Sequence, residues 1–285
     1  MKGLLRLCFA GFCAGLSGGC LDSTVTLSLN RDGSGSVTLE ECYSPRLTIA
    51  LGGNDRSGAT NTLPGGVFTQ TVAFVTGVAE DRAKEFGGGV QLVSLRRKIG
   101  PNKGAGFSAV YAFDDVNRLR IGLNAGGCRR GDDDWEGARF RNDLTSYSFD
   151  YAAGDVSALV IKPALALPKT AMTNDVEALP EAKERMARRM LKGFRTRFVV
   201  QLNGIMAETD GKGGARDGMN SLTVVDFSMD RLLSSSNGMK LAFSPDPKDQ
   251  AALSATNIPG VFVSDPSKPI TVRFDTVGPI PEGPR

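Results

Sequence analysis

The residues that could carry chemistry in this sequence are its cysteines and its carboxylates. The chain has 285 residues, with five cysteines and no histidine. The absence of histidine excludes Ser-His-Asp and Cys-His catalysis, and metal or haem ligation by imidazole. Pairs of Asp and Glu need no histidine, so a carboxylate-dependent hydrolase remains an open function class. Asp114 and Asp115 are poor partners for each other, because adjacent side chains of an extended segment point to opposite faces.

An acidic segment at residues 131–137 surrounds the only tryptophan of the chain. Such a grouping could bind a cation or stack against a sugar ring. Neighbouring carboxylates without a scaffold rarely converge on one ligand, however, and three arginines lie close by in the sequence. We therefore predict a solvated loop, and retain as a candidate cation or ligand site the residues Asp132, Asp133, Asp134, Trp135 and Glu136.

Residues 30–41 resemble an EF-hand calcium loop. Asn30, Asp32 and Ser34 offer oxygen ligands, Gly35 stands at the sharp turn, and Glu41 occupies the twelfth position. An EF-hand needs a helix on each side of this loop, whereas the flanking residues here alternate with a period of two, which is typical of strands. We therefore predict a β-hairpin and no metal site in this segment.

Residues 1–19 are predicted to be a signal peptide that is removed from the mature chain. Lys2 and Arg6 form a positive start, residues 7–16 are apolar, and three small residues precede Cys20. A membrane-spanning helix needs about 20 apolar residues, so this segment is too short to be one. The protein is therefore expected to be exported.

The run Leu16-Ser17-Gly18-Gly19-Cys20 resembles the lipobox of bacterial lipoproteins. In that family the cysteine becomes the first residue of the mature chain and receives acyl chains such as palmitate on its sulfur and its amino group. The resemblance implies lipid attachment at Cys20 and a stable anchor in a membrane of the cell envelope. Ordinary secretion is the alternative, because Ser17 and Gly19 also satisfy the rule for cleavage after Gly19.

Two cysteines remain in the mature chain once Cys8 and Cys13 leave with the signal peptide and Cys20 takes lipid. Exported proteins fold in an oxidising compartment. We hypothesise a disulfide between Cys42 and Cys128, which would contribute about 3 to 5 kcal/mol. Two unrelated buried thiols are the alternative.

The charge pattern does not indicate binding to nucleic acid. Removing Lys2 and Arg6 from the 34 basic residues leaves a near balance with the 31 acidic residues. No basic stripe interleaved with aromatic residues is present. The basic groups at 96–98 and 129–130 are interpreted as solvated faces.

Apolar periodicity in the first half predicts a hairpin over 24–43, a helix over 76–86 and strands at 90–99 and 107–113. Thr76 is expected to cap the helix, Gly87 to end it, and Glu80 to pair with Lys84 on its surface. The first strand is expected to begin about four residues after Cys20, which leaves a tether of roughly 13 Å at full stretch.

The second half shows a similar order of elements. A hairpin is predicted over 147–162, a helix over 180–192, and strands at 198–202 and 222–227. The Pro-, Ser- and Asp-rich segment 234–285 is expected to be an extension with short strands at 261–263 and 270–274, packed on this half.

These elements predict an α+β fold made of antiparallel hairpins, with one helix packed on each module. A hypothesis of two similar ββαββ modules follows, with chance similarity as the alternative. The predicted organisation is a signal peptide at 1–19, a first module at 20–125, a second module at 140–233 and the extension at 234–285.

Several predicted features together look like the LppM-type domain of bacterial lipoproteins. They are the signal peptide with its lipidated cysteine, the opening strand pair, the short helix, and the strands that end near an Asp-x-x-Leu turn. The resemblance covers residues 20–120. It implies an α+β domain facing the envelope, with a non-catalytic role that includes contact with lipid.

The sequence therefore predicts a lipid-anchored envelope lipoprotein that acts as a binding or structural module, with no cofactor, no metal and no catalytic residue. Its expected partners are the membrane, through the acyl chains, and an envelope protein, lipid or glycan. The alternatives are a carboxylate-dependent hydrolase of envelope polysaccharide and a carrier of an apolar, lipid-like ligand.

Overall fold

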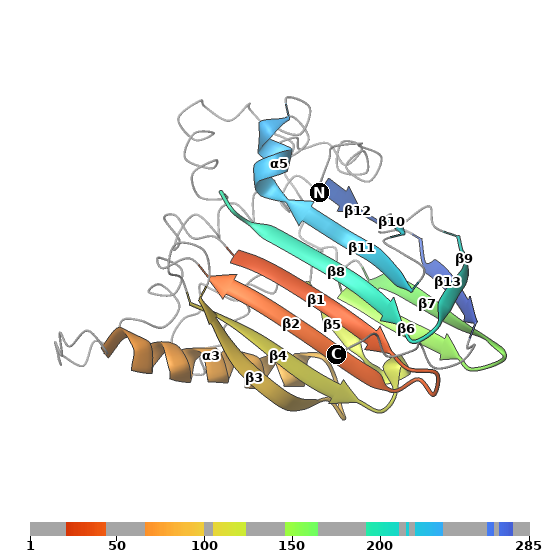
Figure 1. Cartoon of the computed structure of the whole chain (residues 1–285), viewed down its shortest axis with the longest axis horizontal. Helices are drawn as coiled ribbons and strands as arrows, with labels where there is room; N and C mark the ends of the chain where they lie inside the picture. The colour runs from red at the N-terminus through yellow and green to blue at the C-terminus, as the bar shows by residue number, and fades with distance from the viewer. Residues whose placement is uncertain are drawn as a thin grey trace, which may run out of the picture.

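The computed structural model of the chain describes residues 21–43, 66–99, 105–123, 146–164, 192–210, 215–216, 220–235, 261–264 and 268–275. Strands predominate, in two sheets of eight and five strands, and the longer of the two described α-helices lies against the larger sheet (Figure 1). The protein is therefore α+β, as the sequence predicted, with a larger share of strand than an even mixture. No helix of the described ranges is both long enough and apolar enough to cross a bilayer.

The large sheet has the strand order β10-β11-β8-β1-β2-β4-β3, and β12 also pairs with β11. All neighbours are antiparallel except β1 and β8, which are parallel. Its strands are β1 (Leu21–Leu29), β2 (Gly35–Tyr43), β3 (Gln91–Ile99), β4 (Ala105–Phe113), β8 (Arg195–Leu202), β10 (Ala215–Arg216), β11 (Ser221–Ser228) and β12 (Val261–Val263).

The small sheet is fully antiparallel and has the order β5-β6-β7-β13-β9. Its strands are β5 (Arg120–Gly122), β6 (Ser146–Ala152), β7 (Val156–Ala164), β9 (Ile205–Thr209) and β13 (Ile270–Asp275). Tyr147 and Phe149 of β6 contact the ring of Phe198 on β8, with ring centroids 5.1 and 6.4 Å apart. The small sheet therefore packs on the β8 side of the large sheet.

Strict alternation in β1 and β2 decides which face of the large sheet is buried. Every second residue of β1, from Leu21 to Leu29, is buried, and the intervening polar residues are half-buried on the other face. In β2 the buried positions include Val37 and Leu39 but also Glu41, the one buried carboxylate in the part of the chain that the structure describes. The core thus lies on one face, between the large sheet and the elements that cover it.

Helix α3 (Gly66–Glu85) covers the part of the buried face of the large sheet that β3 and β4 form (Figure 1). Ala79 and Phe86 are buried there, and Gly87 ends the helix with a φ of +119°, as expected of a glycine after a helix. The predicted start at Thr76 is wrong by ten residues, because the Val- and Thr-rich segment 66–75 has weak helix propensity and shows no start signal. Lys84 pairs with Asp81 rather than with Glu80, at 2.9 Å.

The two halves of the chain do not repeat one arrangement. The hairpin β1–β2 lies in the large sheet and the hairpin β6–β7 in the small one, while β8 of the second half pairs with β1 of the first. These positions are not equivalent, so the topology does not support two duplicated ββαββ modules. The helix predicted at 180–192 lies outside the described residues.

The C-terminal segment contributes one strand to each sheet, and both strands pair with strands of the second half of the chain. Strand β13 lies between β7 and β9, and β12 pairs with β11. Two short helical turns follow β4 and β11, namely the 3-10 turn η2 (Val116–Arg118) and the helix α5 (Met229–Ser234).

Candidate functional site

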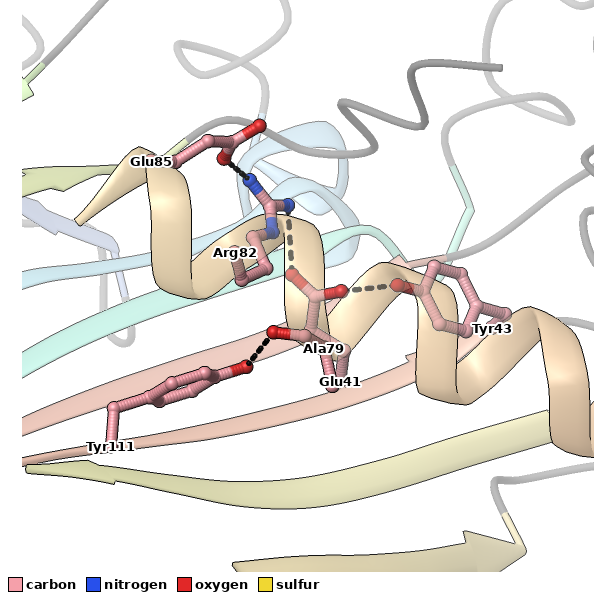
Figure 2. Close-up of polar contacts among 6 residues, drawn as sticks. All are labelled: Glu41, Tyr43, Ala79, Arg82, Glu85 and Tyr111. Atoms are coloured by element: carbon pink, nitrogen blue, oxygen red, sulfur yellow. Dashed lines mark hydrogen bonds and ion pairs between the residues drawn. The ribbon is translucent and has the colours of Figure 1, made fainter. Parts of the chain in front are cut away.

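A charged cluster is buried between β2 and α3 (Figure 2). The Arg82 guanidinium donates to Glu41 Oε1 at 3.0 Å and to Glu85 Oε2 at 2.6 Å, and the Tyr43 hydroxyl donates to Glu41 Oε2. The side chains of Arg82 and Glu41 are only 6% and 1% exposed, whereas Glu85 is 42% exposed. We call Glu41, Tyr43, Arg82 and Glu85 the buried cluster.

Burial and charge act in opposite directions on Arg82. Burial alone would lower the pKa of its guanidinium, but the carboxylates of Glu41 and Glu85 raise it by more, so the net pKa lies above its ordinary value. Nearby, the Tyr111 hydroxyl donates to the backbone oxygen of Ala79 at 3.0 Å, and burial followed by the Glu41 charge raises the pKa of Tyr111. Arg82 is therefore a permanent cation under the helix.

This arrangement fixes a helix rather than performing a reaction. Glu41 Oε1 accepts a hydrogen bond from Arg82 and Oε2 accepts one from Tyr43, and the carboxylate is shielded from water. A general acid or base needs access to the proton it transfers. The buried cluster instead joins α3 to β2 by a charge-assisted contact, in addition to the apolar contacts of Ala79 and Phe86.

A second group of charges lies on the opposite, outer face of the large sheet. Register places Asp22 of β1 beside both Arg195 of β8 and Cys42 of β2. Arg195 Nη2 donates to both carboxylate oxygens of Asp226 on β11, at 3.1 Å each. An ion pair also joins Lys98 of β3 to Glu40 of β2. We call these residues the outer-face charge cluster: Asp22, Glu40, Lys98, Arg195 and Asp226.

The pKa of the Asp22 carboxyl is raised above its ordinary value. Burial is the main cause; the Arg195 charge opposes it, and the charges of Asp226 and Glu40 reinforce it. A raised carboxyl pKa is also a property of catalytic acids. Here, however, the neighbouring carboxylates Asp226 and Glu40 are each held by a cation, so the arrangement is typical of an ion-pair network on a sheet surface.

The segment with the EF-hand spacing is a hairpin turn, as predicted. Ser34 donates to Asp32 Oδ1 from its amide at 3.0 Å and from its hydroxyl at 2.6 Å, and Asn30 Nδ2 donates to Ser34 Oγ at 3.1 Å. Glu41 lies near the far end of β2, buried against Arg82, so it cannot complete a calcium site with these residues. No group of metal-binding side chains occurs in the described part of the chain.

The other predicted site residues are mostly outside the described ranges. This holds for Cys20, for Cys128 and for the acidic segment at 131–137. Cys42 is described: it is half-buried on the outer face, and burial, followed by the charge of Asp22, raises the pKa of its thiol. The disulfide between Cys42 and Cys128 therefore stays a hypothesis.

The sequence analysis missed the buried cluster, although two signals of it were present. Glu41 continues the alternation of Val37 and Leu39 and so occupies an inward position of β2. Arg82 lies three residues after Ala79 and four before Phe86, and therefore on the same helix face as these buried residues. A carboxylate and a guanidinium on two faces that must pack together predict a buried ion pair.

Comparison with known proteins gives a faint structural likeness. No family model matches the chain, and no curated protein matches it. Among solved structures, the chain is similar to the folded domain of LppM from Mycobacterium tuberculosis, determined by NMR, at 9% sequence identity and a TM-score of 0.32. The match covers 92% of this chain and 94% of that domain. The resemblance to LppM-type domains expected from the sequence is found again, and it is faint.

Proposed function

We propose that this protein is an exported lipoprotein, held at a membrane of the bacterial envelope by acyl chains on Cys20, and that its folded domain acts there as a non-catalytic binding or structural module. The observation that supports the anchor is the position of β1. This strand begins at Leu21, the residue after the lipobox-like run that ends in Cys20. The predicted signal peptide thus ends directly before the first strand that the structure describes.

The non-catalytic role is supported by how the described carboxylates are used. In the buried cluster, Glu41 is held by Arg82 and Tyr43; in the outer-face charge cluster, Asp226 is held by Arg195 and Glu40 by Lys98. A glycoside hydrolase needs two carboxyl groups that face one substrate, one as acid and one as base or nucleophile. These pairings favour a structural use of the acids over the hydrolase alternative.

The proposed ligands are an envelope protein, a lipid or a glycan. The acidic segment of Asp132, Asp133, Asp134, Trp135 and Glu136 is retained as the candidate contact for such a ligand, because a tryptophan among carboxylates suits a sugar ring or a cation. A disulfide between Cys42 and Cys128 is part of the same proposal, since export exposes both thiols to an oxidising compartment.

The test is the intact mass of the mature N-terminus after expression of the full chain in a bacterium with a lipoprotein pathway. We expect a chain that starts at Cys20 and carries acyl chains, recovered in the membrane fraction. The Cys20→Ser variant should keep its signal peptide, because lipoprotein processing requires the modified cysteine. An unmodified Cys20 at the mature N-terminus, or a Cys20→Ser chain cleaved after Gly19, would instead establish ordinary secretion.

A further inference from the structure

We infer that the end of the large sheet at which β1 begins is the surface that faces the membrane, and that Arg96, Arg97 and Lys98 of β3 bind anionic lipid headgroups there. The inference rests on the proposed acylation of Cys20. It goes beyond it by assigning an orientation to the domain and a lipid class to a set of side chains that the sequence alone presents as a solvated basic face.

The first step is the short distance along the chain between Cys20 and β1. The sequence predicted a strand that starts about four residues after Cys20, which would leave a link of roughly 13 Å. In the structure β1 begins at Leu21, which is paired with Tyr43, and Asp22 is paired with both Cys42 and Arg195. The Cα atom of Cys20 must lie about 3.8 Å from that of Leu21. An acylated Cys20 therefore brings this end of the sheet directly to the bilayer surface.

The second step is the level of the basic residues along the sheet. Lys98 lies opposite Gly106, which lies opposite Cys42, which lies opposite Asp22, so Lys98 and Asp22 are at the same height. At about 3.3 Å per residue, this height is roughly 7 Å from Cys20 along the strand direction. The polar headgroup region of one leaflet is about 5 to 7 Å deep. Lys98 thus lies at headgroup level when the strands stand upright on the membrane. The same pairings place Arg97 level with Ser23 and Arg96 level with Thr24, about 10 and 13 Å from Cys20, so these two long side chains must extend toward the membrane to meet the headgroups.

The third step is the charge that β3 presents. Arg96, Arg97 and Lys98 are all exposed at the end of this edge strand. Lys98 forms an ion pair with Glu40, while Arg96 and Arg97 form no ion pair with another residue of the described ranges. Alternation places Arg97 on one face of the sheet and its two neighbours on the other. Guanidinium groups match the geometry of phosphate oxygens, and each basic residue close to an anionic leaflet strengthens binding by about fivefold.

The opposite end of the sheet offers a matched comparison. Arg31 lies in the turn between β1 and β2, and Arg120 lies in β5, beyond the far end of β4. Both side chains are exposed, and neither forms an ion pair with another described residue. These two arginines have the same chemistry as Arg96 and Arg97 but lie at the end of the sheet away from the proposed membrane.

The experiment uses the full-length lipidated protein, incorporated into vesicles of phosphatidylcholine alone or with about one third phosphatidylglycerol. Arginine side chains are modified with phenylglyoxal, and the rate at each arginine is measured by mass spectrometry of peptides, with protein in detergent micelles as the reference. On the anionic vesicles, Arg96 and Arg97 should react about fivefold more slowly than in micelles, while Arg31 and Arg120 keep their micelle rates. Added salt at about 1 M should remove most of this protection, because it shortens the screening length to about 3 Å.

A variant pair extends the test. Its readout is the rate at which Lys98 is chemically acetylated on the vesicles. In the Arg96→Gln/Arg97→Gln variant this rate should be nearly independent of the phosphatidylglycerol content. In the Arg31→Gln/Arg120→Gln variant it should depend on phosphatidylglycerol as in the parent. Equal rates at all four arginines, or protection of Arg31 and Arg120 instead, would overturn the inference. The N-terminal mass and the flotation of the same samples report on Cys20 separately: acylated protein that floats with unprotected Arg96 and Arg97 contradicts this inference alone, and protein without acyl chains contradicts the proposed function.

Discussion

Replacing Arg82 with methionine is the most informative perturbation of this fold. The substitution removes the guanidinium and keeps a flexible apolar side chain of similar length. Glu41, which is 1% exposed, would then retain a single donor, the Tyr43 hydroxyl, for a buried negative charge. Breaking a buried ion pair by removing one partner costs about 3 to 5 kcal/mol. Against a typical stability of about 5 to 15 kcal/mol for a folded domain, this loss should be conspicuous.

The assay is urea unfolding followed by circular dichroism, with the unfolding free energies compared at a common slope. Lys84→Met is the matched control, because Lys84 lies on the same helix and pairs with Asp81, but its side chain is 78% exposed. An exposed pair of this kind contributes little to stability, because water and salt screen its charges. The double variant Glu41→Leu/Arg82→Met should recover more than half of the loss, since it leaves no unpaired charge under the helix.

Two results would refute this reasoning. One is an Arg82→Met variant no less stable than Lys84→Met, which would mean that water reaches Glu41 and solvates it. The other is a double variant as unstable as Arg82→Met alone, which would mean that the loss comes from packing of the Arg82 side chain and not from the stranded charge of Glu41.

Three further predictions concern single positions. Burial raises the pKa of Asp22, so the native state binds this proton more tightly than the unfolded state, whose Asp22 pKa is near 3.8, and stability falls as pH rises from that value through the native pKa. The Asp22→Asn variant should lack this loss of stability, and a difference in melting temperature between variant and parent that does not grow with pH would contradict the prediction. Gly35→Ala should destabilise the protein by about 1 to 3 kcal/mol, because the new Cβ would lie 2.1 Å from the backbone oxygen of Ser28, whereas Gly77→Ala, in open space on α3, should stabilise it by up to about 1 kcal/mol. Equal melting temperatures of these two variants would exclude the clash at Gly35. After reduction, Cys42 in the native protein should react with iodoacetamide about tenfold more slowly than in urea, since burial raises its thiol pKa, and equal rates would contradict that burial.

Where one face of a strand is buried and the other polar, the sequence was sufficient to predict the element. The alternation at Val25, Leu27 and Leu29, and again at Phe107 and Tyr111, is the direct consequence of a side-chain period of two on a half-buried sheet. The hairpin turn at residues 30–34 was also predictable, because Asp32 and Ser34 hydrogen-bond locally in the way that turn residues do.

Contacts between distant segments were not predictable in this way. The parallel pairing of β1 with β8 joins Asp22 to Arg195, and nothing in the local pattern of either strand specifies its neighbour. Strand β13 alternates correctly in the sequence, yet periodicity does not reveal that it inserts between β7 and β9. The two-module hypothesis was unsupported for this reason: local order repeats along the chain, but the partners of each strand do not.

The place of β1 in the large sheet has a mechanical consequence for the proposed attachment at Cys20. β1 is a central strand, paired with β2 from Leu21 to Leu29 and with β8 from Asp22 to Leu29. A pull on the acylated residue acts along the strand axis, so it loads both ladders of hydrogen bonds in shear, and these bonds must yield together. An edge strand such as β3 could instead peel from its single neighbour one bond at a time. Attachment at the residue next to a central strand therefore suits a domain that must keep both its fold and its orientation while lipid holds one end.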